Sequence, residues 1–173
     1  NHWHLVLWPR ADGDLSEFMR WLTVTHTQRW HAHRHTSGTG PVYQGRFKSF
    51  PIQRDSHFLT VCRYVERNAL RANLVARAED WPWGSLHRRT RYHAEDTDWL
   101  LPTRAWPVQP PRNWKAQVNR GDDPETVEAI RHAVRRGAPY GTPTWRTRTA
   151  ARLGLESTLR PQGRPRKRRK DAQ

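Results

Sequence analysis

The 173-residue chain carries 31 Lys and Arg against 16 Asp and Glu, a formal net charge of +15 that excludes an acidic or charge-balanced surface. Hydrophobic residues make up 35% of it, below the roughly 45 to 50% of ordinary globular domains, so only part of the chain can form a core. Ten Trp, four Tyr and four Phe compensate with large apolar faces. Because clustered cations gain affinity for phosphates by releasing counterions, we expect a polyanionic partner, with nucleic acid as the first choice.

The cysteine content and the hydropathy pattern bound the compartment. The single cysteine, Cys62, excludes an intrachain disulfide and a zinc site built from cysteines. There is no secretory signal and no apolar run of the ~18 residues that a membrane span needs, so we expect a cytoplasmic protein without a membrane partner. The chain opens on Asn1 and goes straight into a strand-like run, which favours a sequence that begins inside a longer protein.

The first elements alternate between extended and helical patterns. Residues 2–8 are short, apolar and aromatic, which predicts a buried strand with both of its histidines on one face. Asp14 with Glu17 forms a capping box for a helix from about Leu15 to about Trp30. A polar, glycine-containing loop is expected over 31–41, followed by a strand or extended arm over 42–52.

A second helix follows Asp55, which serves as its cap. Its buried stripe is predicted from apolar residues at spacings of three and four: Phe58, Cys62, Val65 and Ala69. Residues 81–85 end the part expected to be compact, and loose packing is expected beyond it, with a short helix from Pro124 to about Arg135. We expect core positions for three tryptophans: Trp21, Trp81 and Trp83.

Paired histidines offer a metal site. His2 and His4 alternate on the predicted strand, so that both rings can reach one divalent ion, although two solvent-exposed or hydrogen-bonded histidines fit the same pattern. A second run, His31, His33 and His35, falls in the predicted polar loop, which favours a solvated or phosphate-facing segment. A zinc-binding module built on this run remains the third interpretation of the chain.

The second helix carries a candidate nucleophile. Tyr64 and Asn68 are four residues apart and share one helical face. A phenol can attack a phosphate that a nearby metal polarises, and the Asn68 amide oxygen could complete that metal site. An ordinary boundary tyrosine and a polar residue near a helix end fit the same spacing.

Four motifs in order resemble the REP-associated tyrosine transposases, a branch of the single-tyrosine HUH transposases. The resemblance covers about residues 1–90, and some members have similar C-terminal tails. The motifs are Asn-His-Trp-His-Leu-Val at 1–6, Tyr-Gln-Gly-Arg-Phe-Lys at 43–48, Tyr-Val-Glu-Arg-Asn-Ala-Leu-Arg-Ala at 64–72 and Trp-Pro-Trp-Gly-Ser at 81–85. Ala69 departs from the family, which usually has proline there.

The resemblance implies a fold and an activity. The fold would be α+β: a ferredoxin-like HUH nuclease domain with helices on one face of an antiparallel sheet, lacking its first strand and helix. The activity would be the nicking and rejoining of single-stranded or hairpin DNA through a 5′-phosphotyrosine formed by Tyr64. His2, His4 and Asn68 would hold Mg²⁺ or Mn²⁺, and the protein would be a nucleoid-associated bacterial monomer or homodimer. A catalytically inactive DNA-binding remnant is the alternative.

Basic residues would hold the DNA. Those expected to line a groove for the phosphate backbone are Arg20, Arg29, Arg46, Lys48, Arg54, Arg63 and Arg67. The tail resembles an AT-hook, whose minor-groove contacts would come from Arg164, Arg166 and Lys167, although a generic basic tail fits it too. We therefore divide the chain into a partial nuclease domain (1–90), a Trp/Pro-rich extension (91–159) and a disordered basic tail (160–173).

Overall fold

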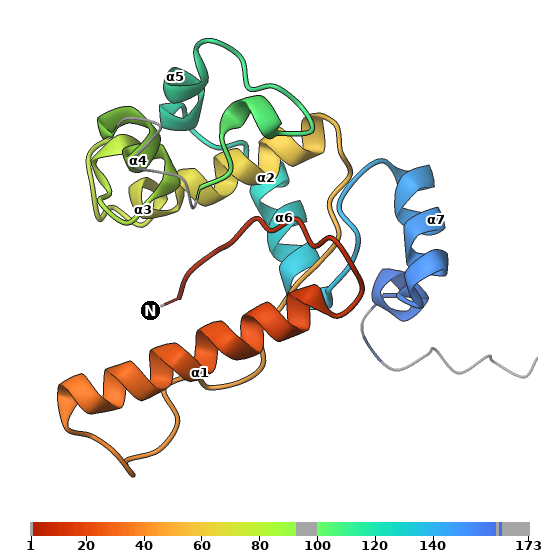
Figure 1. Cartoon of the computed structure of the whole chain (residues 1–173). Coiled ribbons are helices and arrows are strands. Elements are labelled where there is room, and N and C mark those ends of the chain that lie inside the picture. The colour runs from red at the N-terminus through yellow and green to blue at the C-terminus, as the bar shows by residue number, and fades with distance from the viewer. Residues whose placement is uncertain (1, 93–99, 162, 164–173) are drawn as a thin grey trace, which may run out of the picture.

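The structure, a computed structural model, describes residues 2–92, 100–161 and 163. Helices dominate this part of the chain (Figure 1). The α-helices are α1 (Asp14–Arg34), α2 (Ser56–Glu66), α3 (Asn68–Arg71), α4 (Ser85–Arg91), α5 (Trp114–Asn119), α6 (Pro124–Arg136) and α7 (Pro143–Leu153). Short 3₁₀ turns are η1 (Ala78–Asp80), η3 (Thr103–Ala105) and η4 (Glu156–Leu159).

The prediction of an α+β, ferredoxin-like fold with an antiparallel sheet is wrong. Over the described residues there is no β-strand, and Ile52 with Tyr140 forms an isolated parallel bridge. Residues 2–10, here named the N-terminal arm, are extended, yet none of the backbone groups of residues 2–9 bonds to another backbone group within the described chain. A strand needs a neighbouring strand for its N–H and C=O groups, whereas a helix satisfies them internally.

The long first helix confirms the predicted one and extends it. α1 begins at Asp14, whose carboxylate accepts the backbone N–H groups of Arg10 and Ala11 at 2.9 Å each. It carries acidic residues in its first turn and basic residues in its last, which suits the helix dipole. The helix continues through His31 to Arg34, so the predicted loop starts later, after His35 in the left-handed conformation.

α2 begins as the sequence predicts. The Asp55 carboxylate accepts the backbone N–H of His57, which caps the helix. Phe58, Cys62 and Ala69 of the predicted stripe are buried, and Val65 is half-buried. The helix ends at Glu66, and α3 starts at Asn68, so Tyr64 and Asn68 belong to consecutive helices.

A hydrophobic cluster, here named the α2–α5 core, joins distant segments. It consists of Phe58, Cys62, Ala78, Leu86, Trp106, Trp114 and Val118. The rings of Phe58 and Trp106 meet edge to face at 5.4 Å between centroids, and those of Trp106 and Trp114 at 6.1 Å. The loose packing expected beyond residue 85 is therefore wrong for Trp106, Trp114 and Val118, which are core residues.

The predicted short helix is confirmed as α6. Asp123 accepts the backbone N–H of Thr126, Pro124 occupies the first turn, and Gly137 ends the helix with a φ of 67°. Val127, Ile130 and Ala133 form its buried stripe. No helix in the described part of the chain is long and apolar enough to cross a lipid bilayer.

Two of the three tryptophans assigned to the core are instead exposed. Trp21 on α1 is 59% exposed and Trp83 before α4 is 80% exposed, whereas Trp81 is half-buried. In Figure 1, α1 projects away from the group formed by α2, α3, α4 and α5. A tryptophan on such a helix finds few neighbours, which explains why Trp21 stays exposed.

Candidate active site

The N-terminal arm brings two histidines to the face of α2 that carries Tyr64. The rings of His2 and His4 meet edge to face with centroids 4.9 Å apart. The His4 ring in turn meets the Tyr64 ring at 5.7 Å, with an angle of 72° between the planes. Residues far apart in the sequence thus form a group of two imidazoles and one phenol.

His4 sits in a partly buried, electropositive environment. Burial lowers the pKa of this imidazole, and the nearby His2 and Arg71 lower it further. The Nε2 atom of His4 is buried and has no hydrogen-bond partner among the described residues. Such an atom is costly unless a ligand or solvent meets it, so the neutral ring offers a free lone pair or N–H to an incoming group.

Asn68 points to an arginine. Its Oδ1 atom accepts a hydrogen bond from Nη2 of Arg71 at 3.0 Å. The same Nη2 atom donates to the backbone carbonyl of Tyr64 at 3.2 Å, and the guanidinium carbon lies 4.0 Å from the centroid of the Tyr64 ring. Arg71 therefore joins Tyr64 and Asn68, the two residues expected to share a site.

The divalent metal expected from the resemblance can be tested against these donors. No group of three or more His, Cys, Asp or Glu side chains in the described chain is arranged to hold a metal. The adjacent rings of His2 and His4, with the orphaned Nε2 atom, fit a metal as two nitrogen donors. Asn68 does not fit as the third ligand, because its oxygen already faces the Arg71 cation.

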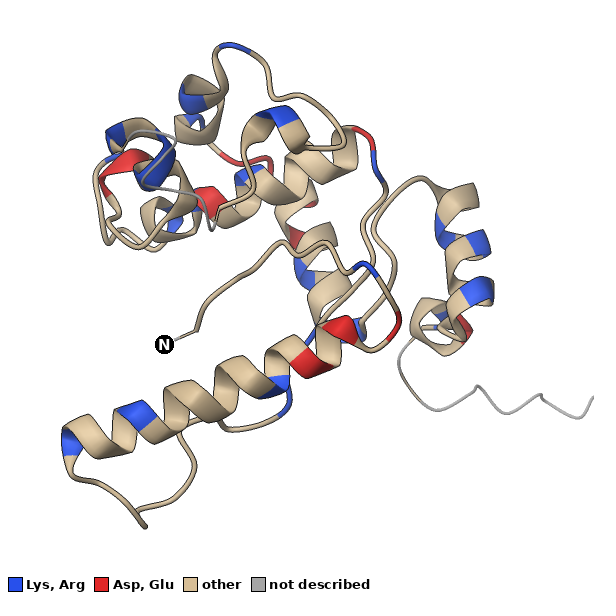
Figure 2. Ribbon diagram, in the orientation of Figure 1, with Lys and Arg blue, Asp and Glu red and all other residues tan. Residues whose placement is uncertain are grey.

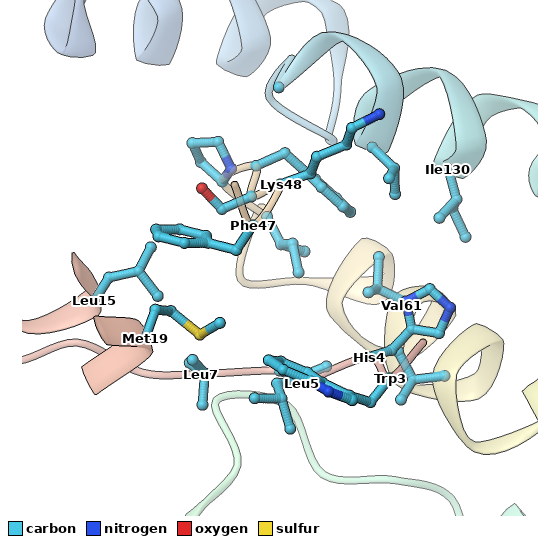
Figure 3. Close-up of a pocket in the computed structure, with 18 of the residues that line it drawn as sticks. Trp3, His4, Leu5, Leu7, Leu15, Met19, Phe47, Lys48, Val61 and Ile130 are labelled. Atoms are coloured by element: carbon cyan, nitrogen blue, oxygen red, sulfur yellow. The ribbon is translucent and has the colours of Figure 1, made fainter. Parts of the chain in front are cut away.

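The three aromatic side chains of this site lie on the wall of a cavity of about 860 Å³. Figure 3 shows Leu7, Met19 and Phe47 at one end of the cavity and His4 with Val61 at the other. Among the described residues, the wall contains Arg46, Lys48, Arg54 and Arg136 and no acidic residue. An apolar hollow with a positive border suits aromatic groups linked by anions.

Five of the arginines and lysines expected to bind DNA are exposed, and lie on α1 and on the extended segment before α2. They are Arg20, Arg29, Arg46, Lys48 and Arg54. The Arg54 guanidinium stacks on the Trp8 ring at 4.3 Å, which links this segment to the N-terminal arm. Figure 2 shows basic positions on α1 and on several other helices, with the acidic ones of α1 confined to its start.

Arg63 and Arg67, also expected on DNA, bind within the protein instead. Together with Arg71 they surround the Asp122 carboxylate, at 3.5, 3.1 and 3.1 Å, in what we name the arginine clamp. Arg63 also donates to the carbonyls of Gln117, Arg120 and Gly121, and Arg67 to that of Val118. These contacts fasten the end of α5 to α2 and leave both arginines little capacity for phosphate.

The remaining predicted contacts divide into two groups. Arg164, Arg166 and Lys167 of the AT-hook-like tail lie outside the described residues.

His31 and His33 lie on the last turn of α1, and His31 Nδ1 meets Thr36 Oγ1 at 2.9 Å. Among the described residues this histidine run forms no metal-binding group, so the zinc-module interpretation gains no support.

Sequence reasoning missed Arg71 and Asp122 as parts of the site. Arg63, Arg67 and Arg71 repeat every four residues, and like charges at this spacing repel unless an anion is shared. That spacing is compatible with a shared anion of any kind, a phosphate or a carboxylate. It does not identify Asp122, which lies 51 residues beyond Arg71. A search with this chain finds no matching family model, no matching curated protein and no matching solved structure.

Proposed function

We propose that this protein nicks and rejoins DNA strands, with Tyr64 as the nucleophile, as the transposases that its motifs resemble do. The observation that carries the proposal is the meeting of the His4 and Tyr64 rings at 5.7 Å, because the two residues come from segments far apart in the chain. A tyrosine that only filled space would not require two imidazoles beside it. The cation-lined cavity next to the ring supports an anionic substrate.

The reaction is an exchange of phosphate esters. The Tyr64 Oη atom forms a bond to phosphorus as the bond from phosphorus to the 3′ oxygen of the preceding nucleotide breaks. The phenol proton is lost and the departing 3′ oxygen gains one, so the charge balances without an oxidant or a nucleotide fuel. Attack of a 3′ hydroxyl on the phosphotyrosine reverses these steps and joins the strands.

His2 and His4 would hold the divalent ion, Mg²⁺ or Mn²⁺. When bound, that ion supplies a Lewis acid that polarises a phosphate oxygen. The chain's own residues supply the rest: His4 meets the phenol ring, and burial favours its neutral, ligand-competent form.

The proposed substrate is single-stranded or hairpin DNA. Its unpaired bases can stack on exposed aromatic side chains such as Trp21 and Trp30, at about 1 to 3 kcal/mol per base. Arg20 and Arg29 lie on the same helix and can bind phosphates of such a strand. The AT-hook-like tail would add contacts in a neighbouring duplex.

The test is whether the protein forms a covalent adduct with DNA. The whole chain is incubated with labelled single-stranded oligonucleotides of random sequence and Mg²⁺ or Mn²⁺, and products are separated on a denaturing gel. We expect a protein-DNA band that Tyr64→Phe abolishes and that the matched variant Tyr92→Phe retains. Persistence of the band in Tyr64→Phe would exclude this residue as the nucleophile.

A DNA-binding protein without cleavage is the second candidate. Asn68 facing Arg71 favours it, because the proposed metal then has two protein ligands instead of three. This candidate requires salt-sensitive oligonucleotide binding and no adduct under any of these conditions. The same gel, read beside a binding titration over several salt concentrations, separates the two.

A further inference from the structure

The Arg71 guanidinium contacts the Tyr64 residue twice, through its ring and through its backbone. The guanidinium carbon lies 4.0 Å from the ring centroid, and Nη2 donates to the Tyr64 carbonyl at 3.2 Å. A cation over an aromatic face is attractive and limits where the ring can turn. Since His4 meets the same ring edge to face, the phenol is held between an imidazole and a guanidinium.

A second element holds Arg71. Its Nη1 atom donates to Asp122 Oδ2 at 3.1 Å, and the Asp122 side chain is 14% exposed. Arg63 and Arg67 share this carboxylate, so Asp122 keeps two guanidinium partners when Arg71 is removed. The clamp can therefore survive the loss of Arg71, whereas no other described residue replaces Arg71 on the Tyr64 ring.

We propose that Arg71 is the positioning residue of the Tyr64 nucleophile, and that Asp122 holds it in place. This inference rests on the proposed function. The phenol has two rotatable side-chain bonds, and a displacement of about 1 Å at a reacting atom can cost on the order of a hundredfold in rate. Arg71 takes no part in the exchange of bonds. It restricts the ring to the orientation in which it meets His4.

Three variants test the proposal: Arg71→Gln, Arg71→Lys and the matched control Arg88→Gln. Arg88 also places its guanidinium over a tyrosine, 5.0 Å from the Tyr92 ring centroid on α4, outside the described site. For each variant, the rate of adduct formation is measured at saturating oligonucleotide, together with oligonucleotide affinity and unfolding temperature. This separates a loss in the chemical step from a loss in binding or folding.

We expect Arg71→Gln to slow adduct formation at saturating DNA by about ten- to a hundredfold while the affinity stays within about twofold. Arg71→Lys should recover part of the rate, because an ammonium group can lie over the ring without the forked hydrogen bonds. Arg88→Gln should leave the rate unchanged. In NMR spectra of protein with labelled tyrosine rings, Arg71→Gln should shift the Tyr64 signals, and Arg88→Gln should not.

The outcomes distinguish the two proposals. An adduct that needs Tyr64 and forms at an undiminished rate in Arg71→Gln overturns the positioning role alone. The positioning role is also overturned if Arg71→Gln and Arg71→Lys lose the same fraction of the rate and both lower the unfolding temperature. That result would indicate that Arg71 has a purely structural part. Absence of any Tyr64-dependent adduct in the unsubstituted protein overturns the proposed function and this inference with it.

Discussion

The α2–α5 core and residues 2–50, here named the N-terminal segment, use the same residue types in opposite ways. In the core, Trp106 and Trp114 are 7% and 9% exposed and pack edge to face. In the N-terminal segment, Trp3, Trp8 and Trp30 are each more than 40% exposed. The difference teaches that aromatic content alone does not make a core. The core helices turn aromatic faces toward one another, whereas the tryptophans of the arm and of α1 keep much of their surface exposed.

Polar groups separate the two regions as well. Glu66 in the core accepts from Ser85 Oγ at 2.8 Å, from Arg89 Nη1 at 2.5 Å and from Trp114 Nε1 at 2.8 Å. These bonds tie α2 to α4 and α5 around a buried carboxylate. In the N-terminal segment a polar contact between Tyr43 Oη and His26 Nδ1, 2.6 Å apart, lies at the surface. Hydrogen bonds to a buried group therefore hold the core together, whereas this hydrogen bond of the N-terminal segment is exposed to solvent.

The largest expected effect comes from removing the buried carboxylate. Glu66→Ala should destabilise the protein by about 3 to 5 kcal/mol, because it leaves the largely buried Arg89 cation without its counterion. Chemical denaturation followed by circular dichroism measures the change. Glu128→Ala is the control, since Glu128 pairs with Arg135 at the surface, and it should have no measurable effect. A tolerated Glu66→Ala would break the view that this network fixes the core.

The same substitution, valine to alanine, made once in each region tests the comparison between them. Val118 on α5 is fully buried, whereas Val24 on α1 is 48% exposed. Val118→Ala should lower the free energy of unfolding by about 2 kcal/mol through lost apolar burial and a residual cavity. Val24→Ala should change it by less than about 0.5 kcal/mol. Equal effects would mean that α1 packs in solution as tightly as α5.

The smallest expected effect is a pH dependence of the free energy of unfolding, contributed by Glu79 next to the core. Burial acts to raise the pKa of Glu79, but hydrogen bonds from Asn119 and Arg77 outweigh it and hold this pKa below its ordinary value. A carboxyl with a depressed folded-state pKa stabilises the protein above its unfolded value of about 4.3, and this stabilisation is lost as the pH falls through the folded value.

Unfolding free energies of the parent protein and of Glu79→Gln, measured at a series of pH values, isolate that contribution. The difference between the two proteins should be constant near neutral pH and should shrink on acidification below about pH 4. Parallel curves at all pH values would show that Glu79 titrates alike in the folded and unfolded chains.

Local signals in the sequence were sufficient for α1, α2 and α6, whereas α4, α5 and α7 were not predicted. Asp55 caps α2 and Pro124 occupies the first turn of α6, as the residue types predict. The capping box expected from Asp14 and Glu17 is wrong, because Gly13 is the N-cap of α1 and the Asp14 carboxylate accepts the backbone N–H groups of Arg10 and Ala11 instead. Apolar spacing also identified Phe58 and Cys62 as core residues. Caps and periodicity are contained within one turn of chain, so they can be recognised without knowing the rest of the fold.

The absence of a sheet from the described residues could not be predicted in the same way. Residues 2–8 have strand composition, yet a strand exists only where another strand pairs with it, and the described chain provides none. The role of Glu66 was equally hidden, since its partner Trp114 lies 48 residues away. Of the candidate site, the residue types were found from motifs, whereas Arg71 and Asp122 became visible only through contacts.

The burial of Cys62 has a practical consequence for measuring how the two regions move. Burial raises the pKa of this thiol to about 12, with a further contribution from the Glu66 charge, so it stays protonated and shielded at neutral pH. A maleimide probe offered to the folded protein should therefore react with a cysteine introduced at an exposed position, such as that of Trp21 or Trp83, and leave the native one untouched. Two such probes would report the spacing between the first helix and the packed block directly in solution.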